Sequence, residues 1–182
     1  MIKATETKLK GCFILEPKVF EDERGYFFES FNHREFCEAI GREVNFVQDN
    51  QSFSKKGVLR GLHFQKGEHA QAKIIQVLEG KIQDVAVDLR KDSSTFAQHF
   101  STELNSEDKK QLLVPRGFAH GFLTLSESAR VLYKCDNFYN KNAEGGIRFD
   151  CSELNIKWLI GKEDLLLSEK DKNLPNYLSA LT

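Results

Sequence analysis

Side chains that can transfer or hold a proton occur inside short, strand-like segments of this sequence. His63, Lys73, His120 and Tyr133 each lie in stretches where apolar residues alternate with polar ones. An imidazole accepts a proton near neutral pH, a phenol can donate one, and an ammonium group can stabilise a negatively charged oxygen. Because inward-facing residues of several antiparallel strands converge on one interior, we expect these four side chains to line one cavity.

Each of these residues also has a purely structural interpretation. A histidine among apolar strand residues is more often a hydrogen-bonded core residue, and a strand tyrosine usually packs in a core. Lys73 could extend its ammonium group past Ile74 and Ile75 to solvent. Chemistry is therefore indicated by the group of residues and not by any single member.

Short strands are the elements that must position these groups. Aromatic and β-branched residues alternate with polar ones, and turn signals separate the stretches at residues 79–80 and 115–117. Regular strands of this length favour a sandwich or a small barrel, of which the jelly roll is one form. Strands are predicted over 24–31, 73–78, 82–89, 111–114, 118–125 and 130–138, and a mixed segment after 158 is expected to wrap the body.

One helix is well marked over residues 32–41. Asn32 can cap its N-terminus, Glu35 occupies the capping-box position, and Gly41 suits the left-handed residue that ends a helix. Phe36 and Ile40, four residues apart, would pack its inner face.

Composition limits the classes of protein to consider. The 182 residues point to one domain over 1–182, and 26 basic against 27 acidic residues give a net charge of -1. That balance argues against a protein that coats nucleic acid or anionic lipid, and no apolar run has the length of a membrane span. The four cysteines are scattered and suggest reduced thiols. With no targeting signal in the first residues, we expect a cytoplasmic protein.

Seven motifs occur in order along the chain: DERGYFFESF (22–31), QDNQSFS (48–54), GVLRGLHFQ (57–65), QAK (71–73), DVAVDLR (84–90), VPRGFAHGF (114–122) and LSEKD (167–171). Together they resemble the dTDP-4-dehydrorhamnose 3,5-epimerases, the isomerases of dTDP-L-rhamnose biosynthesis. The resemblance implies a mainly β fold, a cupin-type jelly-roll barrel with a few short helices. It also implies epimerisation at C3 and C5 of dTDP-4-dehydro-6-deoxy-D-glucose, through enolates and without a cofactor, to dTDP-4-dehydro-L-rhamnose.

The resemblance assigns catalytic roles to four residues. His63 would be the base, and Asp171 would orient its ring and stabilise the imidazolium. Lys73 would stabilise the enolate oxygen, and Tyr133 would donate a proton from the opposite face. Without the resemblance, Asp171 would be interpreted as a solvated residue in the charged run 169–172. A relative that inverts only one carbon, or that uses another nucleotide sugar, is the closest alternative function.

The resemblance also implies nucleotide contacts and a second subunit. Arg24, Arg60 and Lys170 suit the diphosphate, since guanidinium and ammonium groups match phosphate oxygens. Tyr139 would stack on the thymine base. In the family, the residues that match Arg24 and Glu29 reach the neighbouring subunit's site from a swapped strand, which implies a homodimer with shared active sites and N-terminal strands in its interface. Further polar contacts to nucleotide or sugar are expected from Glu29, Gln48, Asn50, His120 and Glu144.

The side chains of Arg60 and His63 would point to opposite faces of a regular strand, although the resemblance places both in the pocket. Gly61 between them indicates a β-bulge or a close backbone approach that re-aims one side chain. A regular strand with Arg60 turned outward would contradict this expectation.

A metal-dependent cupin is the alternative from another class. Such proteins carry an H-x-H pair, a glutamate a few residues later and a further histidine after P-x-G. Here Gln65 replaces the second histidine of the pair, so only His63 and His120 could be ligands. Two imidazoles without a carboxylate at the right spacing make a poor transition-metal site, and we expect no metal there.

Overall fold

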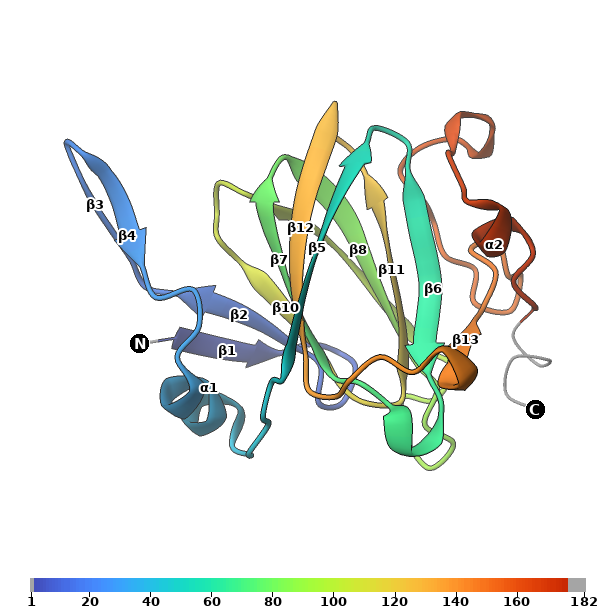
Figure 1. Cartoon of the computed structure of the whole chain (residues 1–182), viewed down its shortest axis with the longest axis horizontal. Coiled ribbons are helices and arrows are strands. Elements are labelled where there is room, and N and C mark those ends of the chain that lie inside the picture. The colour runs from blue at the N-terminus through green and yellow to red at the C-terminus, as the bar shows by residue number, and fades with distance from the viewer. Residues whose placement is uncertain (1, 177–182) are drawn as a thin grey trace.

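Two antiparallel sheets form the body of the protein in this computed structural model, which describes residues 2–176 (Figure 1). The six-stranded sheet contains, in spatial order, β1 (Ile2–Glu6), β2 (Phe13–Pro17), β10 (Gln111–Val114), β7 (Lys73–Glu79), β12 (Ser128–Cys135) and β5 (Gln48–Lys55). The five-stranded sheet contains β13 (Glu144–Gly146), β6 (Leu59–Gln65), β11 (Phe118–Thr124), β8 (Lys81–Asp88) and β9 (His99–Asn105). Neighbouring strands come from distant parts of the chain, as in a jelly roll, and the predicted mainly β, cupin-type fold is confirmed.

Apolar side chains from both sheets fill much of the space between them. Ile75 and Val131 of the six-stranded sheet belong to the same buried cluster as Ile82, Ala86 and Phe122 of the five-stranded sheet. Because side chains alternate along a strand, this packing defines which positions of each strand face the interior.

The outer face of the five-stranded sheet is covered by the C-terminal part of the chain. Val85 and Val87 pack there with Ile147 and Leu154, so both faces of β8 are buried. The predicted division of β8 into two faces is confirmed. The mixed segment that follows contains a 3-10 helix, η3 (Lys162–Asp164), and the short helix α2 (Glu169–Lys172), as expected.

Helix α1 (His33–Ile40) packs on the six-stranded sheet and matches the predicted helix. The Asn32 side chain accepts a hydrogen bond from the backbone N–H of Glu35, and Gly41 ends the helix at φ 70°. Phe36 and Ile40 are buried against the sheet, in one cluster with Leu15 and Ile74. Two further 3-10 helices are η1 (Gly67–His69) and η2 (Lys141–Ala143).

A separate hairpin of β3 (Val19–Asp22) and β4 (Gly25–Phe28) extends away from the barrel (Figure 1). The predicted strand over 24–31 is therefore too long at both ends. Arg24 lies in the turn, where its side chain is held by Asp22, and Glu29 accepts a hydrogen bond from the Asn32 amide as the chain enters α1.

Three other predicted strands end earlier than expected, among them β8, which stops at Asp88 and not at residue 89. β12 stops at Cys135, and the side chain of the next residue, Asp136, accepts hydrogen bonds from the Ala72 N–H at 2.6 Å and the Arg116 Nε at 2.7 Å. β11 stops at Thr124, one residue early. At these strand ends, the residues that form the turns decide where the strand stops, and the apolar pattern of the sequence does not.

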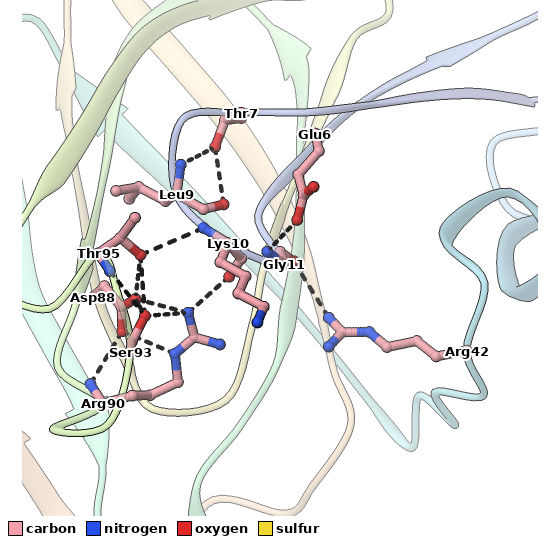
Figure 2. A network of polar contacts seen from close by, with 10 residues as sticks. All are labelled: Glu6, Thr7, Leu9, Lys10, Gly11, Arg42, Asp88, Arg90, Ser93 and Thr95. Carbon is pink, nitrogen blue, oxygen red and sulfur yellow. Dashed lines mark hydrogen bonds and ion pairs between the residues drawn. The ribbon is translucent and has the colours of Figure 1, made fainter.

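A buried ion pair fastens the connection between β1 and β2 to the barrel (Figure 2). Arg90 donates to both carboxylate oxygens of Asp88 and also to the backbone oxygen of Lys10. Ser93 and Thr95 donate their hydroxyls to the same carboxylate, at 2.6 and 2.7 Å. These bonds outweigh the burial that alone would raise the pKa of Asp88, and lower it to about 2.

The four cysteines, Cys12, Cys37, Cys135 and Cys151, are free thiols. Burial raises the pKa of the Cys12 thiol to about 12, which keeps it protonated. Among residues 2–176, no helix is long and apolar enough to cross a membrane.

Candidate active site

A cavity of about 320 Å³ opens between the two sheets. It brings together residues that are more than a hundred positions apart in the sequence. Its walls come from strands of both sheets and from α2 and the residue that precedes it. The lining residues are Arg60, His63, Lys73, His120, Phe122, Tyr133, Glu144, Ser168, Lys170 and Asp171.

The histidines lie on one wall and the lysine and tyrosine on the other. His63 of β6 pairs directly with His120 of β11 in the five-stranded sheet. Lys73 of β7 is two residues before Ile75, the register partner of Tyr133 on β12, so both side chains lie on the inner face of the six-stranded sheet. The two sheets therefore present different chemical groups to the same space.

Arg60 and His63 both line the cavity because β6 contains an extra residue. The register passes from His120 opposite His63 to Phe122 opposite Arg60, so two steps on β11 match three on β6. Gly61 has φ 127°, and a Cβ on it would lie 2.6 Å from the Gly121 Cα. The predicted bulge and close backbone approach at Gly61 are both observed. Arg60 is further held by Ser54, whose hydroxyl oxygen accepts from its Nε at 3.0 Å.

Asp171 holds His63 from the C-terminal segment. Its Oδ1 lies 2.5 Å from the His63 Nε2, and its Oδ2 accepts a hydrogen bond from the Ser168 hydroxyl at 2.9 Å. Ser168 also caps α2 by accepting from the Asp171 N–H. Burial raises the pKa of Asp171, but the bonds from His63 and Ser168 outweigh it and leave the pKa below its ordinary value.

His120 has its own carboxylate partner. Its Nε2 lies 2.9 and 3.0 Å from the two oxygens of Asp84, which is fully buried. The Nε2 atoms of both cavity histidines are thus engaged by carboxylates.

Burial and nearby charges shift the pKa values of Lys73 and Tyr133 from their values in water. Burial lowers the pKa of the Lys73 ammonium, and Cys135, Asp84 and Glu144 oppose that effect. Burial raises the pKa of the Tyr133 phenol, Cys135 adds to the rise, and Arg60 counteracts it. The phenol is therefore protonated at neutral pH, as a proton donor must be.

A second cavity of about 350 Å³ adjoins the first and shares His63, Lys73, Tyr133 and Glu144 with it. Its outer end is built from polar side chains of β5 and of the loop after β12. Gln48 accepts a hydrogen bond from the Tyr139 N–H at 3.1 Å and donates to Asn50 at 3.0 Å. The additional lining residues are Gln48, Asn50, Phe64, Gln65, Gln71, Cys135 and Tyr139.

Glu144 joins the two cavities. It forms an ion pair with Lys170 and accepts a hydrogen bond from the Tyr139 hydroxyl at 3.3 Å. Burial raises the pKa of Glu144, and the bonds from Lys170 and Tyr139 outweigh that effect, so its pKa is lowered. A charged carboxylate therefore lies between the cavity that contains the two histidines and the cavity that contains Tyr139.

Two predicted binding residues do not reach these cavities in their own chain. Arg24 and Glu29 lie on and next to the projecting hairpin, and the Arg24 side chain is 85% exposed. The other predicted residues all line one cavity or the other.

Sequence reasoning missed Asp84, Ser168, Ser54 and Phe122 as members of the site. Two of them carried a signal. Asp84 is a carboxylate at an inward position of an apolar strand, where an unpaired charge is costly and a partner is therefore expected. Ser168 stands three residues before Asp171, the spacing of a helix N-cap.

Comparison with known proteins identifies the family. The family model for dTDP-4-dehydrorhamnose 3,5-epimerase matches residues 6–178. The Salmonella typhimurium protein of that name is 54% identical over 158 residues, which are 87% of this chain and 86% of that protein.

Solved structures agree with the sequence relatives. The crystal structure of dTDP-4-dehydrorhamnose 3,5-epimerase from Elizabethkingia anophelis matches with a TM-score of 0.96 and 55% identity, covering 100% of this chain and 99% of that one. The Bacillus anthracis structure, with TDP and PPi bound, matches with a TM-score of 0.93 and 46% identity over 97% of this chain and 100% of that one. The family match spans most of the sequence and the structural match spans the whole barrel, so the chain belongs to the dTDP-4-dehydrorhamnose 3,5-epimerase family.

Proposed function

We propose that the two adjoining cavities carry the reaction of this family, with His63 as base, Tyr133 as acid and Lys73 as the cation beside the ketone oxygen. The chain is an isomerase of dTDP-L-rhamnose biosynthesis. Its reaction inverts C3 and C5 of dTDP-4-dehydro-6-deoxy-D-glucose and yields dTDP-4-dehydro-L-rhamnose. Both carbons are next to the C4 ketone, so removal of either proton gives an enolate.

The placement of base and acid on opposite walls is the observation that carries this proposal. His63 extends from the five-stranded sheet and Tyr133 from the six-stranded sheet. Inversion requires that a proton leave one face of the ring and return to the other. An imidazole on one wall and a protonated phenol on the other supply both transfers without moving the substrate.

Lys73 supports the same mechanism because one cation can serve both carbons. The enolates formed at C3 and at C5 carry their charge on the same oxygen, the former ketone oxygen at C4. A half-buried ammonium stabilises such a charge more strongly than a solvated one. We therefore assign the C4 oxygen to the neighbourhood of Lys73.

Asp171 supports the assignment of His63 as base. A carboxylate on Nε2 leaves the other ring nitrogen, Nδ1, as the position that faces substrate, and it stabilises the imidazolium once the proton is taken. His120, held by Asp84, is assigned to sugar contacts on the same wall.

The base of the nucleotide is assigned to the second cavity and the diphosphate to the first. Tyr139 of the second cavity offers an aromatic face for thymine, and Gln48 and Asn50 offer amides for polar contacts. Arg60 and Lys170 of the first cavity offer cations for the diphosphate. The relative from Bacillus anthracis is bound to TDP and PPi, and the one from Legionella pneumophila to dTDP-4-keto-L-rhamnose, which supports a dTDP-sugar as substrate here.

We further propose a homodimer in which each hairpin enters the partner's site, with residues 1–182 forming a single domain per subunit. Phe20, Tyr26 and Phe27 are each more than half exposed on the hairpin, an apolar area that a second subunit would cover. This arrangement would bring Arg24 and Glu29 to the nucleotide. Free, scattered thiols support a cytoplasmic location.

Exchange in deuterium oxide tests the proposed function. With dTDP-4-dehydro-6-deoxyglucose as substrate, deuterium should enter both C3 and C5, and His63→Asn should abolish exchange at both carbons. Tyr133→Phe should reduce net inversion more than proton abstraction. His99→Asn, a histidine on β9 outside the cavity, is the matched control and should exchange normally.

The outcomes separate the alternatives. Label at one carbon selects a single epimerase, and a 3'-monoepimerase from Streptomyces bikiniensis is among the structural relatives, at 30% identity and a TM-score of 0.87. Absence of exchange at both carbons contradicts the proposed function. Equal loss of inversion and exchange in Tyr133→Phe contradicts its role as the acid.

A further inference from the structure

His33, Cys37 and Glu43 form a compact cluster at helix α1, on the outer side of the six-stranded sheet. One ligand atom from each, an imidazole nitrogen, a thiol sulfur and a carboxylate oxygen, lies within 4.8 Å of the other two. Within residues 2–176 this is the one group of three or more metal-ligating side chains with such spacing. The proposed epimerase mechanism uses none of the three.

The helix and its C-terminal turn create the cluster. His33 and Cys37 are four residues apart, so they lie on the same side of α1 one turn from each other. Gly41 then reverses the chain in the left-handed conformation, and Arg42 N–H bonds back to the Cys37 oxygen at 3.2 Å. This reversal returns Glu43 to His33, where the carboxylate lies 2.7 Å from the imidazole Nε2.

We propose that His33, Cys37 and Glu43 bind one zinc ion, with water completing a tetrahedral shell. The proposal is independent of the epimerase activity. It concerns a structural site that no part of the proposed reaction requires.

The distances need little change to admit an ion. The Cys37 Sγ is 3.9 Å from the His33 Nε2. A tetrahedral zinc with bonds of about 2.0 Å to nitrogen and about 2.3 Å to sulfur separates those atoms by about 3.5 Å. The carboxylate must move away from the imidazole by about half an ångström so that the ion replaces the shared proton. Both side chains have solvent on one side, since His33 is 44% and Glu43 65% exposed, which leaves room for this change.

The donor set selects the type of metal. One nitrogen, one thiolate sulfur and one oxygen suit zinc and other borderline cations, whereas magnesium and calcium prefer oxygen alone. Zinc binds cysteine as the thiolate, so binding releases the Cys37 proton. Affinity should therefore rise with pH.

The ion would join the first turn of α1 to the segment after its C-terminus. α1 directly follows the hairpin and Glu29, and the segment after it leads into β5. A bond between the two ends of the helix should raise the thermal stability of this part of the protein without contact to the cavity.

Cobalt titration of the full-length, chelator-treated protein tests the site. One equivalent of Co²⁺ should give a thiolate-to-cobalt charge-transfer band, which one equivalent of Zn²⁺ should remove and which excess Mg²⁺ should leave unchanged. Cys37→Ser should abolish the band, and His33→Asn and Glu43→Gln should each weaken cobalt binding at least about tenfold. Glu38→Gln, an exposed carboxylate on the same helix, is the matched control and should bind as the unmodified protein does.

Thermal unfolding supplies the second measurement. Zinc should raise the unfolding temperature of the unmodified chain and of Glu38→Gln but not that of Cys37→Ser, whose fold is checked by circular dichroism without metal. A charge-transfer band that persists in Cys37→Ser places the metal at another thiol and overturns the proposal. The same follows from binding only at millimolar metal without a thiolate band, which indicates an adventitious ion only.

Discussion

The proposed catalytic base, His63, is oriented by a chain of contacts. Ser168 holds Asp171, and Asp171 holds His63, through bonds of 2.9 and 2.5 Å. Because hydrogen bonds to an ionised carboxylate lower its pKa, Ser168 helps keep Asp171 charged and ready to stabilise an imidazolium. Ser168 is thus a positioning residue, and its effect should depend on pH.

Replacement of this hydroxyl tests that interpretation. In Ser168→Ala the pKa of Asp171 should rise, so the loss of activity on the acid side should begin at a higher pH. A hydrogen bond to a charged group contributes about 1.5–3 kcal/mol, so kcat should fall at least about tenfold while KM changes little. Profiles of kcat against pH measure both effects.

The conservative variant and a distant serine complete this test. Ser168→Thr keeps a hydroxyl and should restore most of the activity, and Ser152→Ala, at an exposed serine, should leave the profile unchanged. A drop in activity that is equal at all pH values would indicate that Ser168 serves only to cap α2.

At the scale of the element, the bulge in β6 sets the direction of two functional side chains. The extra residue on β6 lets Arg60 and His63 face the same cavity, and it requires the backbone of Gly61 to lie against Gly121. A side chain at position 61 would be strained by the positive φ, and its Cβ would lie only 2.6 Å from the Gly121 Cα. β6 therefore tolerates only glycine there.

Gly61→Ala should separate β6 from β11. We expect a loss of at least about 2 kcal/mol in the free energy of unfolding, from backbone strain and overpacking together, and a strong loss of activity as His63 and Arg60 move. Gly67→Ala is the matched control, because Gly67 also has a positive φ, of 57°, but no atom within 4 Å of its Cβ position. It should cost only about 1 kcal/mol, from strain alone. Equal losses in the two variants, measured by urea unfolding, would show that the contact with Gly121 is unimportant.

The Asp88 cluster sets a pH limit on the stability of the β1–β2 connection. The pKa of the Asp88 carboxyl is about 2 in the folded protein and near 3.8 in the unfolded chain, so the folded state favours the ionised carboxylate. That stabilisation is complete above pH about 4 and is lost as the pH falls toward about 2. Its size is about 2 kcal/mol, from 1.36 kcal/mol for each pKa unit.

Asp88→Asn should therefore lower the free energy of unfolding by at least about 2 kcal/mol at pH 7. The difference from the unmodified protein should narrow as the pH falls from 4 to 2, because the folded state then progressively binds a proton at Asp88. Asp108→Asn, at an exposed carboxylate, is the control. Urea unfolding at several pH values measures the difference, and a gap that does not change with pH would argue against the carboxylate charge as its cause.

At the scale of the whole molecule, the proposed second subunit accounts for the projecting hairpin. Its apolar side chains are exposed and its Arg24 lies away from the cavities of its own chain (Figure 1). A symmetric dimer would cover the apolar side chains of the hairpin and would bring Arg24 into the partner's site.

Mixed dimers test whether the sites are shared. A heterodimer of one Arg24→Ala chain and one His63→Asn chain, purified through two different tags, contains one site with both residues intact if the hairpins are exchanged. It should show about half the wild-type activity, although each parent homodimer is nearly inactive. If every subunit used its own Arg24, neither site would be intact and the heterodimer would be as inactive as its parents.

The strand pattern, helix α1 and the family were predictable from the sequence alone. These follow from local chemistry: alternation with a period of two, the Asn32 and Gly41 caps, and ordered motifs that chance does not reproduce. The sequence also indicated the bulge at Gly61, since two pocket residues that would point to opposite faces of a regular strand require one. The ends of β4 and β12 were not predictable, because the residues that follow them, Glu29 and Asp136, make side-chain bonds to Asn32 and Ala72 that no local pattern indicates.

Which side chains from distant parts of the chain contact each other is visible only in the three-dimensional structure. Asp84 and Ser168 contact the site residues, Arg24 and Glu29 lie outside the cavities of their own chain, and Glu43 lies beside His33. Such contacts depend on register, on chain reversal and on the packing of one sheet against another. These are properties of distances between residues far apart in the chain, and alternation along a single strand carries no information about them.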